Sequence, residues 1–170
     1  MRYNTIRKMD ISNGEGCRVS VFTQGCNVQC KGCFNFMLWD KTKGKEWTEE
    51  TKKLVFSLLE PEYILGISWL GGEPSMWADE ITELNKEIRE KFPNKTIWLY
   101  SGHTMESLMM NDSTQKLLDT VDVLVDGPFV EELKTCEIPF RGSRNQRILR
   151  KNGNSFIEAS DSEFILIIVN

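Results

Sequence analysis

Short apolar runs alternate with stretches of helical periodicity along this chain. Each run is about the length of a strand and is bounded by polar residues, glycine or proline, which is the pattern of a buried strand. The strands predicted in this way cover residues 17–23, 66–70, 96–100, 121–125, 146–150 and 163–169. Asn152-Gly153, between the last two, is a typical signal for a type I′ turn.

Three helices are predicted between these strands. The first begins after Thr48, which stands as an N-cap before an acidic first turn and is followed by the apolar stripe Leu54, Val55, Leu58 and Leu59. The second covers residues 77–92, where Ile81, Leu84, Ile88 and Phe92 recur at helical spacing. The third covers residues 105–120, with a break near Asn111-Asp112.

The alternation of strands and helices predicts an α/β fold with a parallel sheet and right-handed crossovers. The pattern does not distinguish an open sheet from a curved partial barrel. Cys26, Gly71, Ser101 and Asp126 all follow the carboxyl ends of predicted strands. Because parallel α/β folds place their ligand sites at that edge, we expect these residues to lie around one site.

The composition is that of an ordinary globular protein of 170 residues, with 40% hydrophobic and 27% charged residues. A chain of this length forms about one domain. The net charge of −4 argues against a nucleic-acid surface, which is normally basic. The polar start of the chain and the lack of a long apolar run predict neither a signal peptide nor a membrane span.

Three of the five cysteines stand in one short loop, as Cys26, Cys30 and Cys33. A structural zinc site needs four ligands, and ferredoxin-type clusters are held by four thiolates. Three thiolates from one loop instead fit a [4Fe-4S] cluster with one iron left open for a substrate. The odd number of cysteines favours metal chemistry in a reducing compartment, hence the cytoplasm, over a disulfide framework.

The C-x3-C-x2-C spacing of this loop resembles the radical S-adenosylmethionine (SAM) superfamily. Residues 10–18, Gln24-Gly25 before the loop and Phe34-Asn35 after it resemble the glycyl-radical-enzyme activases of that superfamily. Residues 121–129 and 139–147 are similar to the branch that activates anaerobic ribonucleoside-triphosphate reductase. The resemblance covers about residues 5–150, which is most of the chain.

The resemblance implies a short partial (β/α) barrel of radical SAM type with mostly parallel strands. It would form a single domain over residues 1–170, with a core of about 5–150 and a C-terminal extension, 151–170, containing a hairpin or strand. The implied cofactors are SAM and a [4Fe-4S] cluster held by Cys26, Cys30 and Cys33. The implied reaction is reductive cleavage of SAM, which yields a radical that is passed to a glycine of the reductase.

The residues expected to hold SAM and the cluster follow from the same resemblance: Gly32, Cys33, Phe34, Gly71, Gly72, Glu73, Ser101 and Asp126. Phe34 would lie against the adenine, and Gly71-Gly72-Glu73 would bind the amino group of SAM. Relatives carry Asp and Asn near Ser101, and this chain departs from that pattern. Asp126 would lie near SAM or the incoming glycine, and the alternative is a structural role as the first residue of an Asp-Gly-Pro turn.

Contacts with the substrate protein are expected at Asn13, Arg18, Arg141 and Asn145. A solvated basic face is the alternative interpretation of Arg141 and the arginines that follow it. The implied partners are the large subunit of the reductase and an electron donor such as flavodoxin, with no nucleic acid or membrane. Two other functions stay open: a radical SAM enzyme acting on another glycyl radical enzyme or a small molecule, and a non-catalytic iron–sulfur electron carrier.

Overall fold

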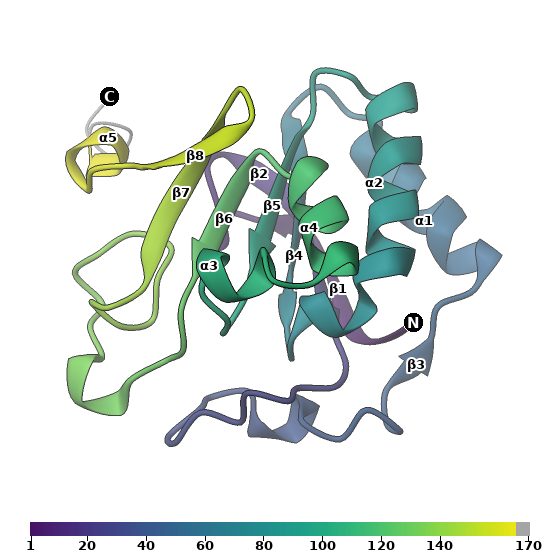
Figure 1. Ribbon diagram of the computed structural model, residues 1–170. Coiled ribbons are helices and arrows are strands. Elements are labelled where there is room, and N and C mark those ends of the chain that lie inside the picture. Colours follow the sequence, from purple (N-terminus) through teal and green to yellow (C-terminus); the bar gives the residue numbers. More distant parts are fainter. Residues whose placement is uncertain (166–170) are drawn as a thin grey trace.

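The computed structural model describes residues 1–165, which form one mixed sheet with helices against it (Figure 1). The four central strands are parallel: β2 (Cys17–Thr23), β4 (Ile64–Gly71), β5 (Thr96–Tyr100) and β6 (Val123–Asp126). The outer strands are antiparallel to their neighbours: β1 (Arg2–Asp10), β3 (Lys45–Glu46), β7 (Arg147–Asn152) and β8 (Ser155–Glu158). The strand order is β3-β1-β2-β4-β5-β6-β7-β8. The α/β fold with a mostly parallel central sheet is therefore confirmed.

Within residues 1–165, β3 and β8 each pair on one side only, so the sheet is open. Two outer strands differ from what the sequence pattern predicts. β1 was missed, because most of its residues are polar, all but Asp10 are partly or fully exposed, and no apolar run marks it. β7 was predicted within a parallel sheet and is antiparallel. A parallel return needs a crossover, usually a helix, and the connection between β6 and β7 has only the 3₁₀ turn Glu131–Leu133.

Helices α1 (Glu49–Leu59), α2 (Ala78–Lys91) and α4 (Asp112–Asp119) cover one face of the sheet (Figure 1). The main core lies between them and the sheet and includes Val19, Val21, Ile67, Trp69, Ile97 and Leu99. The hydroxyl of Thr48 caps α1 by accepting a bond of 3.3 Å from Thr51 N. Asn111 caps α4, which separates it from α3 (Met105–Leu108), so the predicted break is confirmed.

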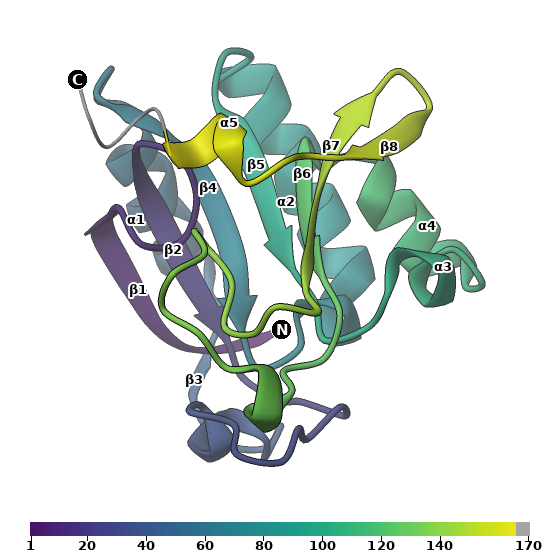
Figure 2. The ribbon, with the colours of Figure 1, turned by 90° about the vertical axis from the view of Figure 1, so that its left-hand side faces the viewer.

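The other face of the sheet meets loops. Side chains alternate along each strand, so Phe22, Leu70 and Tyr100 point to this face while their neighbours enter the main core. Figure 2 shows residues 127–146 (green), which we call the lid segment, crossing this face toward the dark blue loop that follows β2. The face opposite the helices is therefore partly covered by the lid segment.

The C-terminal region differs from the prediction at two points. The β7–β8 hairpin turns at Gly153 (φ 59°) and Asn154, whose φ is not positive, so the geometry fits type II′ and not type I′. The predicted strand 163–169 is wrong at its start, because Ser162–Ile165 form a helix, α5. Glu163 reaches back to Ser160 N at 2.9 Å, which is half of a capping box. Residues 166–169 lie outside the described residues.

None of the helices within residues 1–165 has the length and apolar character needed to cross a bilayer.

Candidate metal and cofactor site

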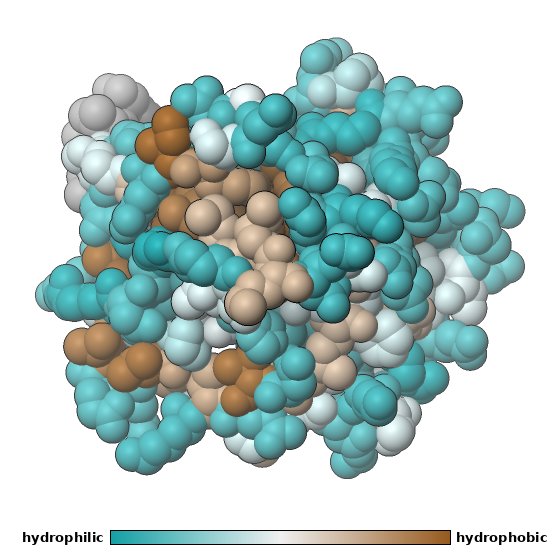
Figure 3. Space-filling view, in the orientation of Figure 1, coloured by the Kyte–Doolittle hydropathy of each residue, from teal (hydrophilic) through white to brown (hydrophobic). Residues whose placement is uncertain are grey.

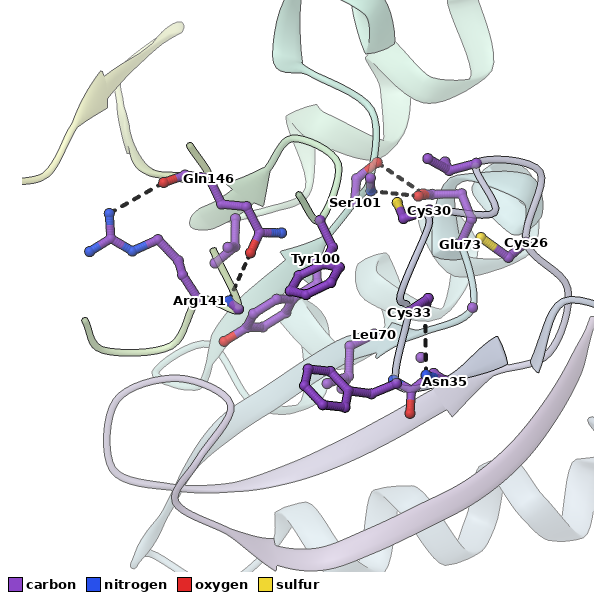
Figure 4. A pocket seen from close by; sticks show the side chains of 18 of the residues that line it. Cys26, Cys30, Cys33, Asn35, Leu70, Glu73, Tyr100, Ser101, Arg141 and Gln146 are labelled. Carbon is purple, nitrogen blue, oxygen red and sulfur yellow. Dashed lines mark hydrogen bonds between the residues drawn. The ribbon is translucent and has the colours of Figure 1, made fainter. Parts of the chain in front are cut away.

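A cavity of about 410 Å³ opens at the carboxyl ends of the parallel strands (Figure 4). It lies between the cysteine loop, the ends of β4 and β5, and the lid segment. The sequence-predicted residues that line it are Asn13, Cys26, Cys30, Cys33, Phe34, Gly71, Gly72, Glu73, Ser101 and Arg141. Gly32, Arg18, Asp126 and Asn145 are not among the lining residues. The topology therefore gathers most of the candidate residues around one space.

Backbone N–H groups donate hydrogen bonds at both ends of the cysteine loop. Gly25 N donates to Leu38 O at 2.7 Å and Cys26 N to Trp39 O at 3.1 Å. At the other end, Asn35 N donates to Cys33 Sγ at 3.3 Å. Gly32 takes a φ of 72°, a conformation that glycine adopts without strain, and so supplies the bend between the second and third cysteines. Gly32 thus shapes the loop from outside the cavity.

All three cysteines of the loop are half-buried free thiols facing the same cavity. Burial raises the pKa of both the Cys26 and the Cys30 thiol, and the nearby charge of Glu73 adds to the effect. A bound metal favours the thiolate and so offsets this penalty. Within residues 1–165, no three such side chains converge closely enough to hold a single metal ion. A [4Fe-4S] cluster does not require that, because each thiolate binds its own iron; the donor set fits such a cluster.

Glu73 is fully buried and joins two of the loops that form the cavity. Its Oε1 accepts from Ser101 Oγ at 2.9 Å and from Ser75 N at 3.0 Å, and its Oε2 accepts from Gly102 N at 2.7 Å. No Lys, Arg or His within residues 1–165 forms an ion pair with it. A buried carboxylate without a cation favours a positively charged ligand in the cavity, such as an ammonium or sulfonium group.

Gly71 and Gly72 are required by close contacts within the protein. A Cβ on Gly72 would lie 2.1 Å from the carbonyl oxygen of Gly25, which also accepts a bond of 2.7 Å from Glu73 N. A Cβ on Gly71 would lie 2.8 Å from Phe22 Cα. From the sequence, these glycines are expected to let a ligand approach the backbone closely. In the structure it is the segment before Cys26 that approaches them.

Asp126 is held away from the cavity by Arg147. Its Oδ1 accepts from Arg147 Nε at 2.9 Å, and its Oδ2 accepts from Met105 N at 2.7 Å and from Arg147 Nη2. Its side chain is 1% exposed. Arg147 also binds the carboxylate of Glu106 and lowers the pKa of that group to about 2. The geometry supports a structural role for Asp126 at the end of β6, and it does not support the expected contact with SAM.

Replacing Arg147 with methionine should lower the free energy of unfolding by about 3 kcal/mol, because Asp126 would keep a buried charge with no cation beside it. Urea unfolding of the cofactor-free protein measures this change. Arg144→Met is the matched control, since Arg144 pairs with Glu137 where both side chains are exposed, and it should cost less than about 1 kcal/mol. Equal losses in the two variants would contradict the structural role.

Of the four residues expected to contact a substrate protein, two line the cavity and two do not. Asn13 and Arg141 line the cavity. The Arg141 guanidinium donates to Pro139 O and Gln146 O, both at 3.3 Å, and pairs with Asp161, so it anchors the lid segment. Asn145 donates to Pro128 O at 2.8 Å and belongs to the same segment.

Arg18 is fully buried, and this burial contradicts its expected place on the surface. It donates to Ser68 Oγ at 2.8 Å, to Ile67 O at 2.7 Å and to Thr96 O at 2.8 Å, and its guanidinium lies over the ring of Trp98. Desolvation lowers its pKa to about 10. Arg18 therefore connects β2, β4 and β5 inside the protein.

Several cavity residues were missed by the sequence analysis, among them Trp39, Tyr100, Phe129, Phe140 and Gln146. The Tyr100 hydroxyl is buried and has no hydrogen-bond partner within residues 1–165, and burial raises its pKa, so it stays neutral. The ring of Phe129 lies 5.7 Å from that of Phe34, between centroids. The alternation along β5 was the only signal for Tyr100, and the lid segment carried no periodic pattern at all.

The comparisons with known proteins agree on one family. Residues 12–149 match the family model described as "4Fe-4S single cluster domain". The anaerobic ribonucleoside-triphosphate reductase-activating protein of Vibrio cholerae is 37% identical over 154 residues, which cover 88% of this chain and 98% of the relative. The proteins of the same name from Enterobacteria phage T4 (37% identical, 87% and 93% covered) and Escherichia coli K12 (35%, 86% and 96%) are similar over nearly the same length.

Proposed function

The chain belongs to the family of anaerobic ribonucleoside-triphosphate reductase-activating proteins, and we propose that it performs the reaction which that name describes. It is a radical SAM activase that generates a glycyl radical on an anaerobic ribonucleoside-triphosphate reductase. When bound, a reduced [4Fe-4S] cluster and SAM would supply the 5′-deoxyadenosyl radical that removes a hydrogen atom from the glycine. The protein itself holds, orients and shields these groups.

The observation that carries the proposal is the placement of three thiols and one uncompensated carboxylate on the walls of a single cavity. Cys26, Cys30 and Cys33 hold the cluster. Glu73 provides negative charge for the cationic end of SAM, and it also holds Ser101 and Gly102 in place. Phe34 lies beside the same space and offers its ring to the adenine.

We propose that the open sheet and the lid segment together form a short partial barrel, within a single domain whose C-terminal extension is residues 151–170. The protein works in the cytoplasm, where the cluster is kept reduced by a donor such as flavodoxin. The large subunit of the reductase closes the open mouth of the cavity when it presents its glycine. Asn13, which lines the cavity and is half-buried, is one of the residues that we propose contact the reductase.

Two measurements on reconstituted protein test this function. With dithionite and SAM, the protein should form 5′-deoxyadenosine, which a non-catalytic electron carrier would not do. With an anaerobic ribonucleoside-triphosphate reductase added, a glycyl radical signal should appear in the electron paramagnetic resonance spectrum. Cleavage of SAM without that signal would favour an enzyme that acts on another glycyl radical enzyme or on a small molecule.

A further inference from the structure

An exposed apolar turn follows the cysteine loop. Phe36 and Met37 lie in the 3₁₀ turn Phe36–Leu38 and are each 63% exposed, while Leu38 beside them is 3% exposed. Figure 3 shows small groups of hydrophobic side chains among hydrophilic ones in the lower half of this view. Large apolar side chains that gather on a surface often mark an interaction site.

The turn is held rigidly against the residues that lead into the cysteine loop. The Gln24 side chain donates to Met37 O at 3.3 Å and to Asp40 O at 2.9 Å. The backbone bonds from Gly25 and Cys26 to the same turn add to this attachment. Phe36 and Met37 therefore keep a fixed position next to the first cluster ligand, and neither of them lines the cavity.

The surroundings of the turn are positively charged, although the whole chain is negative. Residues 27–46 carry four lysines against Asp40 and Glu46, a net charge of +2, so the other 150 residues carry −6. Lys41 and Lys43 are exposed on this segment. Within residues 1–165, Lys41 forms no ion pair, and Lys43 has only a distant one, at 4.0 Å from Asp40. The surface thus combines apolar side chains with free positive charge.

We infer that Phe36, Met37, Lys41 and Lys43 form a docking surface, which we call the lysine face, for an acidic one-electron carrier protein that reduces the cluster. The inference rests on the proposed function. SAM and the glycine of the reductase occupy the cavity on one side of the cysteine loop. An electron donor therefore has to approach the loop from the side that faces away from the cavity. The carrier is a flavoprotein of flavodoxin type: its anionic flavin hydroquinone loses one electron and becomes the neutral semiquinone, and the cluster gains that electron without a proton.

The physical chemistry of such a complex matches this surface. Lysines around the contact steer an acidic partner into place and make association dependent on salt. Phe36 and Met37 supply the apolar centre that a short-lived complex buries. Because the turn is already rigid, it loses little conformational entropy when the partner binds.

The test compares two variants with two matched controls. Phe36→Ser/Met37→Ser removes the apolar centre and Lys41→Glu/Lys43→Glu reverses the charge, while Met110→Ser and Lys53→Glu change exposed residues elsewhere. Binding of oxidised flavodoxin to cluster-free protein is measured at low and high salt. We expect both lysine-face variants to raise the dissociation constant at least about tenfold, and the controls to change it less than about twofold. Charge reversal should also remove most of the salt dependence.

Activity of the cluster-loaded protein gives the second measurement. Cleavage of SAM driven by reduced flavodoxin should fall about tenfold in both lysine-face variants. Cleavage driven by dithionite, which needs no docking surface, should change less than about twofold. Unchanged flavodoxin binding would overturn the inference. A loss of glycyl radical formation with dithionite as the reductant would also overturn it, because the surface would then serve the reductase. Failure of the wild-type protein to cleave SAM with dithionite would instead contradict the proposed function.

Discussion

Changing Cys26, Cys30 or Cys33 to alanine is expected to abolish both cluster binding and SAM cleavage. Each thiolate would bind a different iron, and within residues 1–165 no other cysteine lines the cavity to replace it. A cluster with two protein ligands would be lost during reconstitution, together with its brown colour. Iron and sulfide content, the visible absorption and 5′-deoxyadenosine formation measure this result directly. Loss of activity should be complete, which makes this the largest effect that we expect.

The other two cysteines provide the controls. Cys136 is exposed on the lid segment, and Cys17 is half-buried at the start of β2, where it packs against the main core. Cys136→Ser and Cys17→Ala should each keep a full cluster and cleave SAM at the wild-type rate within about a factor of two. A complete cluster in any of the three loop variants would show that the ligand assignment is wrong.

Replacing Gly72 with valine should destabilise the protein and displace the cysteine loop. A Cβ at this position would lie 2.1 Å from Gly25 O, and backbone atoms cannot yield as a flexible side chain does. The bond from Glu73 N to Gly25 O would be lost with the contact, one residue before the first cluster ligand. We expect a loss of about 3 kcal/mol in unfolding free energy, together with poor cluster incorporation. Urea unfolding and the iron content after reconstitution measure the two effects.

Gly142→Ala is the matched control for this variant. Gly142 also lines the cavity, and its added Cβ would meet the ring of Phe129 at 3.2 Å, a neighbour that can shift slightly. Its cluster content should match the wild type. If Gly72→Val keeps a stable fold and a full cluster but loses affinity for SAM, then Gly72 serves the ligand directly and the packing argument is wrong.

The chemistry of the site could be predicted because it is local in the sequence. Cys26, Cys30 and Cys33 stand within one loop, and Gly71-Gly72-Glu73 directly follows a strand that its apolar run marks clearly. The strands 17–23 and 96–100 have the same bounds in the structure, since a continuous buried run lies within each. β1 escaped prediction for the opposite reason, because most of its residues are polar and all but Asp10 are partly or fully exposed, so no apolar run marks it.

The roles of individual polar residues could not be predicted, because each depends on a partner far away in the sequence. Asp126 meets Arg147, and Glu73 meets Ser101 and Gly102 across 28 and 29 positions. Arginine usually lies at the surface of a protein. Arg18 is nevertheless fully buried, because its side chain donates hydrogen bonds to β4 and β5 inside the fold. A charge that is desolvated in this way is stable only when such partners surround it.

The sequence by itself determined the central parallel sheet, the three cysteines that line one cavity and the edge at which that cavity lies. These features follow from periodicity, from ligand spacing and from the rule that parallel strands present their carboxyl ends together. Only the tertiary structure decided that β7 turns back antiparallel, that Asp126 and Arg18 are internal supports and that Tyr100 reaches the cavity. The physical reason is that burial and pairing are properties of the folded chain, and each residue carries only a preference for them.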